Sequence, residues 1–238
     1  MACLWATILV CSPASRSQNL TVTGQVDVRS EASRSKKASR SNVVVWLSPL
    51  DEGSQLRPVA QEKPASPPRL VQKKKNFEPH ILVVPAGTAV EFPNHDPFFH
   101  NVFSLFEGKR FDLGLYEAGT TRMVRFDRAG VSYIFCNIHP EMSAVVIALK
   151  TPYYGVSDGA GKITIPDVPA GRYAMQVWAE GASAEYLKSL NREVTISASE
   201  HSLGTVRILE DRPPGPHKNK YGRDYDAPGT DYPPSEPN

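Results

Sequence analysis

Three side chains that can bind a metal lie close together near the middle of the chain. Cys136, His139 and Met142 follow the spacing C-x2-H-x2-M in the segment FCNIHPEM, where a predicted strand ends and a loop begins. A tight loop can fold three such side chains around one ion. A thiolate with a thioether selects a soft or borderline metal, and an imidazole suits copper particularly well. The alternative is a strand end that carries these residues by chance.

A second imidazole is available upstream, in the segment FPNHDPFFHNVFS. His100 opens a predicted strand over 100–103, so its ring can be aimed at the loop from a rigid element. His95 lies in a polar, proline-containing segment that is typical of a turn, and we expect it to be a surface or hydrogen-bonded residue. With His100, the loop residues make two imidazoles, one thiolate and a weak thioether, which is the donor set of a blue-copper electron-transfer site.

Short strands must position these residues. The 238-residue chain is 40% hydrophobic, with 21 Pro and 16 Gly, and it has few long helical patterns. Alternating or β-branched runs predict strands at 20–28, 42–47, 81–84, 89–92 and 100–103, followed by TRMVRFD, VSYIFC and SAVVIAL. Residues 48–75 are rich in Pro, Gln and Lys, which predicts an extended loop. This pattern predicts an all-β fold of sandwich or barrel type.

The composition divides the chain into segments. Residues 19–150 form the predicted first domain, and residues 151–210 a smaller β unit with Gly and Pro turns. The strands between 20 and 50 can belong to either one. Residues 211–238 have almost no aliphatic side chains and are predicted to be disordered. The net charge of +2 gives no reason to expect nucleic acid as a partner.

The first residues predict export. An apolar run ends in Ser-Pro-Ala, so residues 1–14 are predicted to be a signal peptide, too short to span a membrane. Lipidation at Cys11 is an alternative, and so is a buried N-terminal strand. If the signal is removed, Cys136 is the only one of the three cysteines that remains. Metal binding is one way to protect an unpaired thiol in an oxidising compartment.

The segments VPAGTAVEFPN…HNVFS and GVSYIFCNIHPEMSAVVIAL resemble the cupredoxins, the plastocyanin and amicyanin group. The resemblance implies a Greek-key β-sandwich with one mononuclear type-1 copper. It implies His100 and His139 as nitrogen ligands, Cys136 as the thiolate and Met142 as the axial ligand. Asn101 matches a position whose side chain helps to hold the cysteine loop in that family.

The resemblance extends to a group of bacterial exported proteins described as plastocyanin-like or methylamine-utilisation-like. In these proteins, CNIHPEM is followed by a segment similar to GKITIPDVPAGRYAMQVW. That segment resembles the carboxypeptidase regulatory-like, transthyretin-like β-sandwich, which is non-catalytic in most contexts. The chain departs from plastocyanins and amicyanins at Ile138, where they usually have Pro. Ile138 has a backbone N–H that Pro lacks and that can reach the Cys136 sulfur.

The residues and the resemblance together predict an exported or periplasmic one-electron carrier that meets redox proteins transiently and is not an enzyme. Copper enzymes built from such units need further clustered histidines, and the remaining histidines have no useful spacing. Two other functions stay open. One is a copper chaperone or buffer that uses the same ligands, and the other is a non-catalytic cell-envelope binding module in which Cys136 is merely buried.

Overall fold

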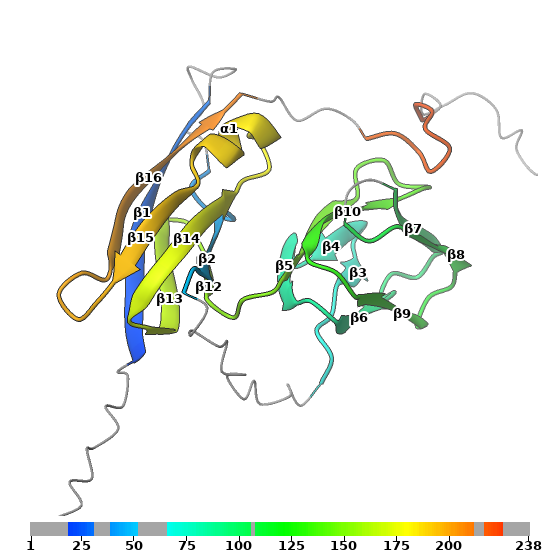
Figure 1. The fold of residues 1–238 in the computed structure, drawn as a ribbon. Helices are drawn as coiled ribbons and strands as arrows, with labels where there is room; N and C mark the ends of the chain where they lie inside the picture. Colours follow the sequence, from blue (N-terminus) through cyan, green and yellow to red (C-terminus); the bar gives the residue numbers. More distant parts are fainter. Residues whose placement is uncertain (1–18, 31–38, 52–65, 106–107, 212–216, 226–238) are drawn as a thin grey trace, which may run out of the picture.

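The computed structural model describes residues 19–30, 39–51, 66–105, 108–211 and 217–225. The predicted signal peptide, with Cys3 and Cys11, lies outside these residues. Within the described ranges, no helix combines the length and the apolar character needed to cross a bilayer. Figure 1 shows two β units side by side, which we call the flanking unit (residues 19–30, 39–49 and 154–210) and the site unit (residues 69–105 and 108–149).

The flanking unit is made of two sheets and one short helix. One sheet has the order β13-β1-β16, with β13 at Lys162–Pro169, β1 at Asn19–Ser30 and β16 at Ser202–Glu210. The other has the order β12-β2-β14-β15, with β12 at Tyr154–Val156, β2 at Val44–Pro49, β14 at Gly171–Trp178 and β15 at Arg192–Ile196. The helix α1, Ala184–Ser189, is capped by Ser183, whose side chain accepts a hydrogen bond from the Tyr186 N–H.

The two N-terminal strands are hydrogen-bonded within the flanking unit. β1 pairs with β13 and β16, and β2 pairs with β12 and β14. The apolar side chains of β1, Val22 and Val26, are buried in the same core as Ile163 and Ile165 of β13. The sequence leaves open whether the strands between 20 and 50 belong to the first domain or to the second β unit. In the structure they pair with strands of the second β unit.

The site unit has a five-stranded sheet of order β5-β11-β10-β7-β8. These strands are β5 Ile81–Pro85, β11 Ser143–Leu149, β10 Gly130–Cys136, β7 His100–Ser104 and β8 Phe111–Tyr116. Two pairs complete the unit: β6 Thr88–Pro93 with β9 Thr121–Phe126, and β3 Val71–Lys73 with β4 Asn76–Glu78. One core joins Phe92 of β6 and Phe126 of β9 to Ile134 of β10 and Val146 of β11. The predicted all-β fold with sandwich architecture is confirmed.

Strand β11 is buried on both faces. Ala144, Val146 and Ala148 belong to the core of the site unit. Val145, Ile147 and Leu149 belong to the core of the flanking unit. This double burial explains why the run SAVVIAL is continuously apolar. A strand with one solvated face alternates apolar and polar residues instead. The flanking unit therefore covers the outer face of the sheet that carries the candidate ligands.

The prediction of an extended loop to Lys75 is wrong at its C-terminal end. Leu70 and Gln72 are completely buried, and residues 71–78 form the hairpin β3–β4. Its turn residues, Lys74 and Lys75, have positive φ angles of 54° and 56°. Lysine rarely adopts this conformation, and here both backbone N–H groups are held by the carboxylate of Asp96. Nothing local in the sequence signals that stabilisation.

Residues 217–225, within the segment predicted to be disordered, contact the site unit. They lie beside the ends of β7 and β10 in Figure 1, where they are coloured orange-red. The prediction rested on the lack of aliphatic side chains. Aromatic rings and hydrogen bonds replace them here: the His217 ring stacks on the Phe135 ring, and the Tyr225 hydroxyl donates to the Cys136 carbonyl.

Candidate metal site

Two neighbouring strands bring the upstream histidine to the cysteine loop. β7 and β10 are antiparallel, with Cys136 opposite Val102 and Phe135 opposite Phe103. The first residue of β7, His100, therefore lies at the same end of the sheet as Cys136, the last residue of β10. Residues alternate between the two faces of a strand, so Cys136 faces the core of the site unit together with Ile134.

The side chains of His100, Cys136 and His139 converge. The Cys136 Sγ lies 3.6 Å from His100 Nδ1 and 3.5 Å from His139 Nδ1, and the two Nδ1 atoms are 3.2 Å apart. His100 and Cys136 are completely buried, whereas His139 is half-buried. The structure thus brings together three of the four predicted ligands, in a group able to hold a metal ion.

The size of this triangle fits a first-row transition metal. A point equidistant from the three atoms lies about 2 Å from each of them, close to the metal–nitrogen and metal–sulfur distances of about 2.0 to 2.3 Å in zinc sites. Each histidine presents its Nδ1 atom to the centre, which leaves its Nε2 atom free for another partner. The donors are thus placed for one ion.

The environment of both imidazoles favours the neutral form, which is the form that binds metals. Burial lowers the pKa of His100, although the neighbouring carboxylate of Asp96 acts in the opposite direction. Burial also lowers the pKa of His139, and the proximity of His100 adds to the effect. A neutral imidazole has the lone pair that a metal requires.

Burial raises the pKa of the Cys136 thiol, since desolvation disfavours the thiolate. The backbone N–H groups of Ile138, Asn101 and His139 act in the opposite direction. They are hydrogen-bond donors that a metal-bound thiolate can use. Ile138 has a backbone N–H, which a proline at this position would lack, and this group acts to lower the pKa of the Cys136 thiol.

Asp96 orients His100. Its Oδ2 atom lies 3.0 Å from His100 Nε2, and both side chains are buried. Desolvation opposes ionisation of Asp96, but the backbone N–H groups of Lys75 and Lys74 and the His100 ring together lower the pKa of its carboxyl. A carboxylate on the second nitrogen of a metal-binding histidine fixes the tautomer and ring direction. The sequence reasoning missed this residue, and its position four residues before His100 was the available signal.

Met142 lies at the base of the loop and is completely buried, in the same core as Cys136. Two backbone hydrogen bonds close the loop: Met142 N–H donates to the His139 carbonyl at 3.0 Å, and Cys136 N–H donates to the Met142 carbonyl at 3.3 Å. The loop therefore holds the backbone of Met142 next to Cys136 and His139. Its part as the axial ligand stays a prediction.

Asn101 and His95 differ in their relation to the site. The Asn101 side chain donates to Asp112 Oδ1 at 2.6 Å, and its backbone carbonyl accepts the Asn137 N–H at 2.8 Å. The backbone of Asn101, rather than its side chain, thus contacts the cysteine loop directly. His95 is exposed, as expected for a surface residue.

A family model described as polysaccharide lyase family 4, domain II, matches residues 149–202, which fall mainly in the flanking unit. The carboxypeptidase regulatory-like resemblance of this segment stays a prediction. No curated protein matches the chain.

Several solved structures are similar to part of the chain. A purple cupredoxin from Nitrosopumilus maritimus is 23% identical at a TM-score of 0.32, over 34% of this chain and 99% of that one. The copper-containing nitrite reductase from Thermus scotoductus SA-01 is 24% identical at 0.34, over 35% of this chain and only 22% of that one. An amicyanin variant in its reduced state is 22% identical at 0.33, over 35% of this chain and 83% of that one. These TM-scores and identities are too low to assign a function to the site, so the assignment rests on the side chains of this chain.

Proposed function

We propose that this protein binds one copper ion as a type-1 site and carries single electrons between redox proteins. The observation that carries the proposal is the triangle of two imidazole nitrogens and one thiol sulfur, in which His100 and Cys136 are buried and His139 is half-buried. His100, Cys136 and His139 would supply these three donors, and Met142 the weak axial thioether. Bound copper would supply the one-electron chemistry, and the chain itself would convert no substrate.

The donors favour copper over other metals. Two imidazoles with one thiolate in a trigonal set, and a thioether nearby, are characteristic of blue-copper centres. A structural zinc site usually has more cysteines, and Cys136 is the single free cysteine among the described residues. A set intermediate between the preferences of Cu(II) and Cu(I) suits an ion that changes its oxidation state with little movement.

The surface beside His139 supports transient contact with another protein. His139 is the half-buried member of the triangle, and the adjacent residue Ile138 is 44% exposed. The ring of Phe98 contacts the rings of both histidines. An electron would leave through His139, where apolar side chains let a partner exclude water without forming a permanent interface.

The burial of the donors favours electron transfer over copper delivery. A chaperone passes its metal on by ligand exchange, which requires access to the ligands, whereas His100 and Cys136 are completely buried and His100 is held by Asp96. We propose, as the sequence indicates, that the protein works after export, in the periplasm or cell envelope.

Voltammetry of the copper-loaded protein tests the carrier role. A carrier gives a reversible one-electron wave, and its copper stays bound through repeated oxidation and reduction. Loss of copper on reduction, or its transfer to a Cu(I) chelator within one cycle, would favour the chaperone role. Cys136→Ser is the matched negative variant, and His95→Ala, at an exposed histidine outside the triangle, is the control that should behave as the native protein.

A further inference from the structure

The segment of residues 217–225, which we call the strap, contacts three consecutive residues at the end of β10. The His217 ring stacks on the Phe135 ring, with centroids 4.2 Å apart and 22° between the planes. The Tyr225 hydroxyl donates to the Cys136 carbonyl at 2.9 Å. The backbone N–H of Lys220 donates to Asn137 Oδ1 at 2.9 Å. Each of these three residues thus has its own partner in the strap.

Lys220 also closes a ring of hydrogen bonds around the loop. Its Nζ atom lies 2.9 Å from Asp112 Oδ2 on β8. Asp112 accepts from the side chain of Asn101 on β7, and the Asn101 carbonyl accepts the Asn137 N–H. The ring passes through β7, β8, the strap and the loop. The Asn101 side chain therefore reaches the loop through Asp112 and Lys220.

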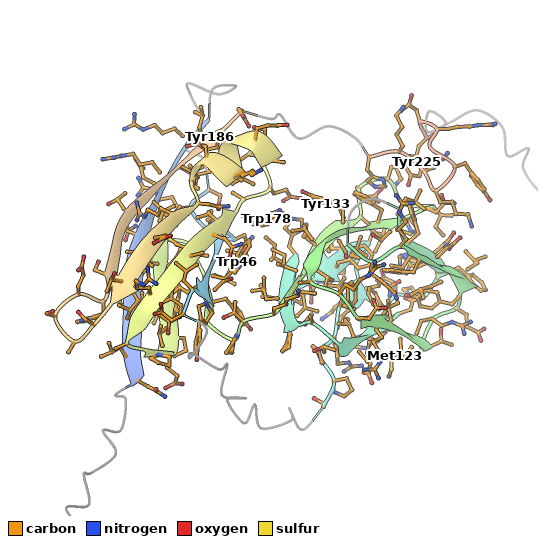
Figure 2. The ribbon with its side chains drawn as sticks, viewed as in Figure 1. Trp46, Met123, Tyr133, Trp178, Tyr186 and Tyr225 are labelled. Atoms are coloured by element: carbon orange, nitrogen blue, oxygen red, sulfur yellow. The ribbon has the colours of Figure 1, made fainter. Side chains whose placement is uncertain are left out.

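The strap is itself braced, so its contacts are held in place. Asn219 N–H donates to the Arg223 carbonyl at 2.8 Å, and Gly222 N–H donates to the Asn219 carbonyl at 2.9 Å. Gly222 has φ of 77°, a conformation that glycine adopts without strain. The Tyr225 hydroxyl lies 3.3 Å from His217 Nδ1, which connects the two ends of the strap (Tyr225 is labelled in Figure 2).

We propose that the strap is part of the metal centre and that Lys220 and Tyr225 are positioning residues for Cys136. A turn of the peptide group after Cys136 would move both the thiol and the loop that carries His139. The Tyr225 hydroxyl fixes the carbonyl of that peptide, and Lys220 fixes the residue that follows. A segment distant in the sequence thus controls how far the thiol is exposed. The consequence for metal retention rests on the proposed copper function.

Alkylation of Cys136 in the metal-free, full-length protein tests the strap without reference to copper. The rate is measured with iodoacetamide by mass spectrometry of the peptide that contains Cys136, which separates it from the other two cysteines. Tyr225→Phe removes only the hydroxyl and should raise the rate about 2- to 10-fold, the factor that one net hydrogen bond contributes. The triple variant His217→Ala/Lys220→Ala/Tyr225→Phe should raise it at least about tenfold.

Tyr221→Phe is the matched control, since Tyr221 lies in the same strap with 73% of its surface exposed. It should leave the rate unchanged. If Tyr225→Phe and the triple variant alkylate at the control rate while keeping the native circular dichroism, the proposal is overturned. A faster rate in Tyr225→Phe alone supports it even if the triple variant fails to fold.

The copper-loaded protein gives a second readout. Release of Cu(I) to a chelator should be faster in Tyr225→Phe than in Tyr221→Phe by a similar factor, and the visible absorption of the Cu(II) form should shift. An unchanged rate of Cu(I) release and an unchanged spectrum would show that the strap is not part of the metal centre. If the native protein binds no copper, the proposed function fails, while the alkylation rates still decide whether the strap holds the loop.

Discussion

His100 Nε2 lies 3.0 Å from Asp96 Oδ2, with both side chains buried. The same carboxylate accepts the backbone N–H groups of Lys74 and Lys75 in the β3–β4 turn. One acidic residue therefore connects a candidate ligand to a turn of unusual backbone conformation. The orientation of the His100 ring depends on a hairpin that lies more than twenty residues upstream in the sequence.

Asp96→Asn tests this connection. The amide keeps the shape of the side chain but loses its charge and offers one acceptor oxygen in place of two. We expect copper affinity to fall about 10- to 100-fold, the usual effect of losing the hydrogen-bond partner of a metal-binding histidine. Competition with a chelator measures it, with Asp127→Asn at an exposed carboxylate as the control. An affinity equal to that of the control would show that Asp96 has no part in the site.

The N–H of Ile138 is expected to tune the reduction potential. A hydrogen bond to a thiolate draws electron density from the sulfur, which weakens its donation to Cu(II) more than to Cu(I). Ile138→Pro removes this donor and should lower the potential, measured by voltammetry. Ile138→Ala removes the same apolar side chain but keeps the N–H, so its potential should stay near the native value. Equal potentials in the two variants would contradict the role of the N–H.

The pair of His80 and Glu180 connects the two units and should make stability depend on pH. His80 Nε2 lies 2.7 Å from Glu180 Oε2. Hydrogen bonding to Glu180 raises the pKa of His80, against the opposing effect of burial. Because the folded-state pKa lies above the usual value of about 6.5, the stabilisation is complete below that pH and is lost as pH rises through the folded-state pKa.

Unfolding of native protein and His80→Gln, followed from pH 5 to 9, measures this contribution. The difference in the free energy of unfolding should be largest at acidic pH and at most about 1 kcal/mol, since the side chains of the pair are 38% and 48% exposed. Glu180→Gln should remove the same pH dependence. A difference that grows toward alkaline pH would have the wrong sign and would reject the assignment.

The double burial of β11 makes a prediction about stability. Ile147 is 1% exposed and packs in the core of the flanking unit. Ile147→Ala should lower the free energy of unfolding by about 2–5 kcal/mol, measured by urea denaturation, without changing the copper spectrum. Met123→Ala, at a side chain that is 58% exposed, should change it by less than about 0.5 kcal/mol. A small effect of Ile147→Ala would mean that the two units do not share this strand.

The cysteine loop and His100 could be predicted from the sequence because the relevant information is local. The spacing of Cys136, His139 and Met142 lies within one short loop, and His100 begins a recognisable strand. For Asp96 the sequence offers only its position four residues before His100, because its other two partners are backbone N–H groups in a hairpin whose turn has no glycine or asparagine. The apolar run of β11 is consistent with burial on both faces, but it does not identify the flanking unit as the part that covers the outer face.

The strap could not be predicted for a different reason. Its composition resembles that of a disordered tail, and composition does not reveal that His217 and Tyr225 find partners on β10. The same limit left residues 20–50 with two assignments. The pairing of β1 with β16 joins segments from opposite ends of the chain, and alternation of apolar residues does not identify the partner strand.

The most direct measurement is the visible and electron paramagnetic resonance spectrum of native protein and Cys136→Ser after loading with Cu(II). We predict one bound copper in the native protein, an intense thiolate-to-copper band that gives a blue or green colour, and narrow copper hyperfine splitting. Cys136→Ser should lose the band. A colourless native protein without bound copper, or a Cys136→Ser variant with the same spectrum, would contradict the assignment of this site.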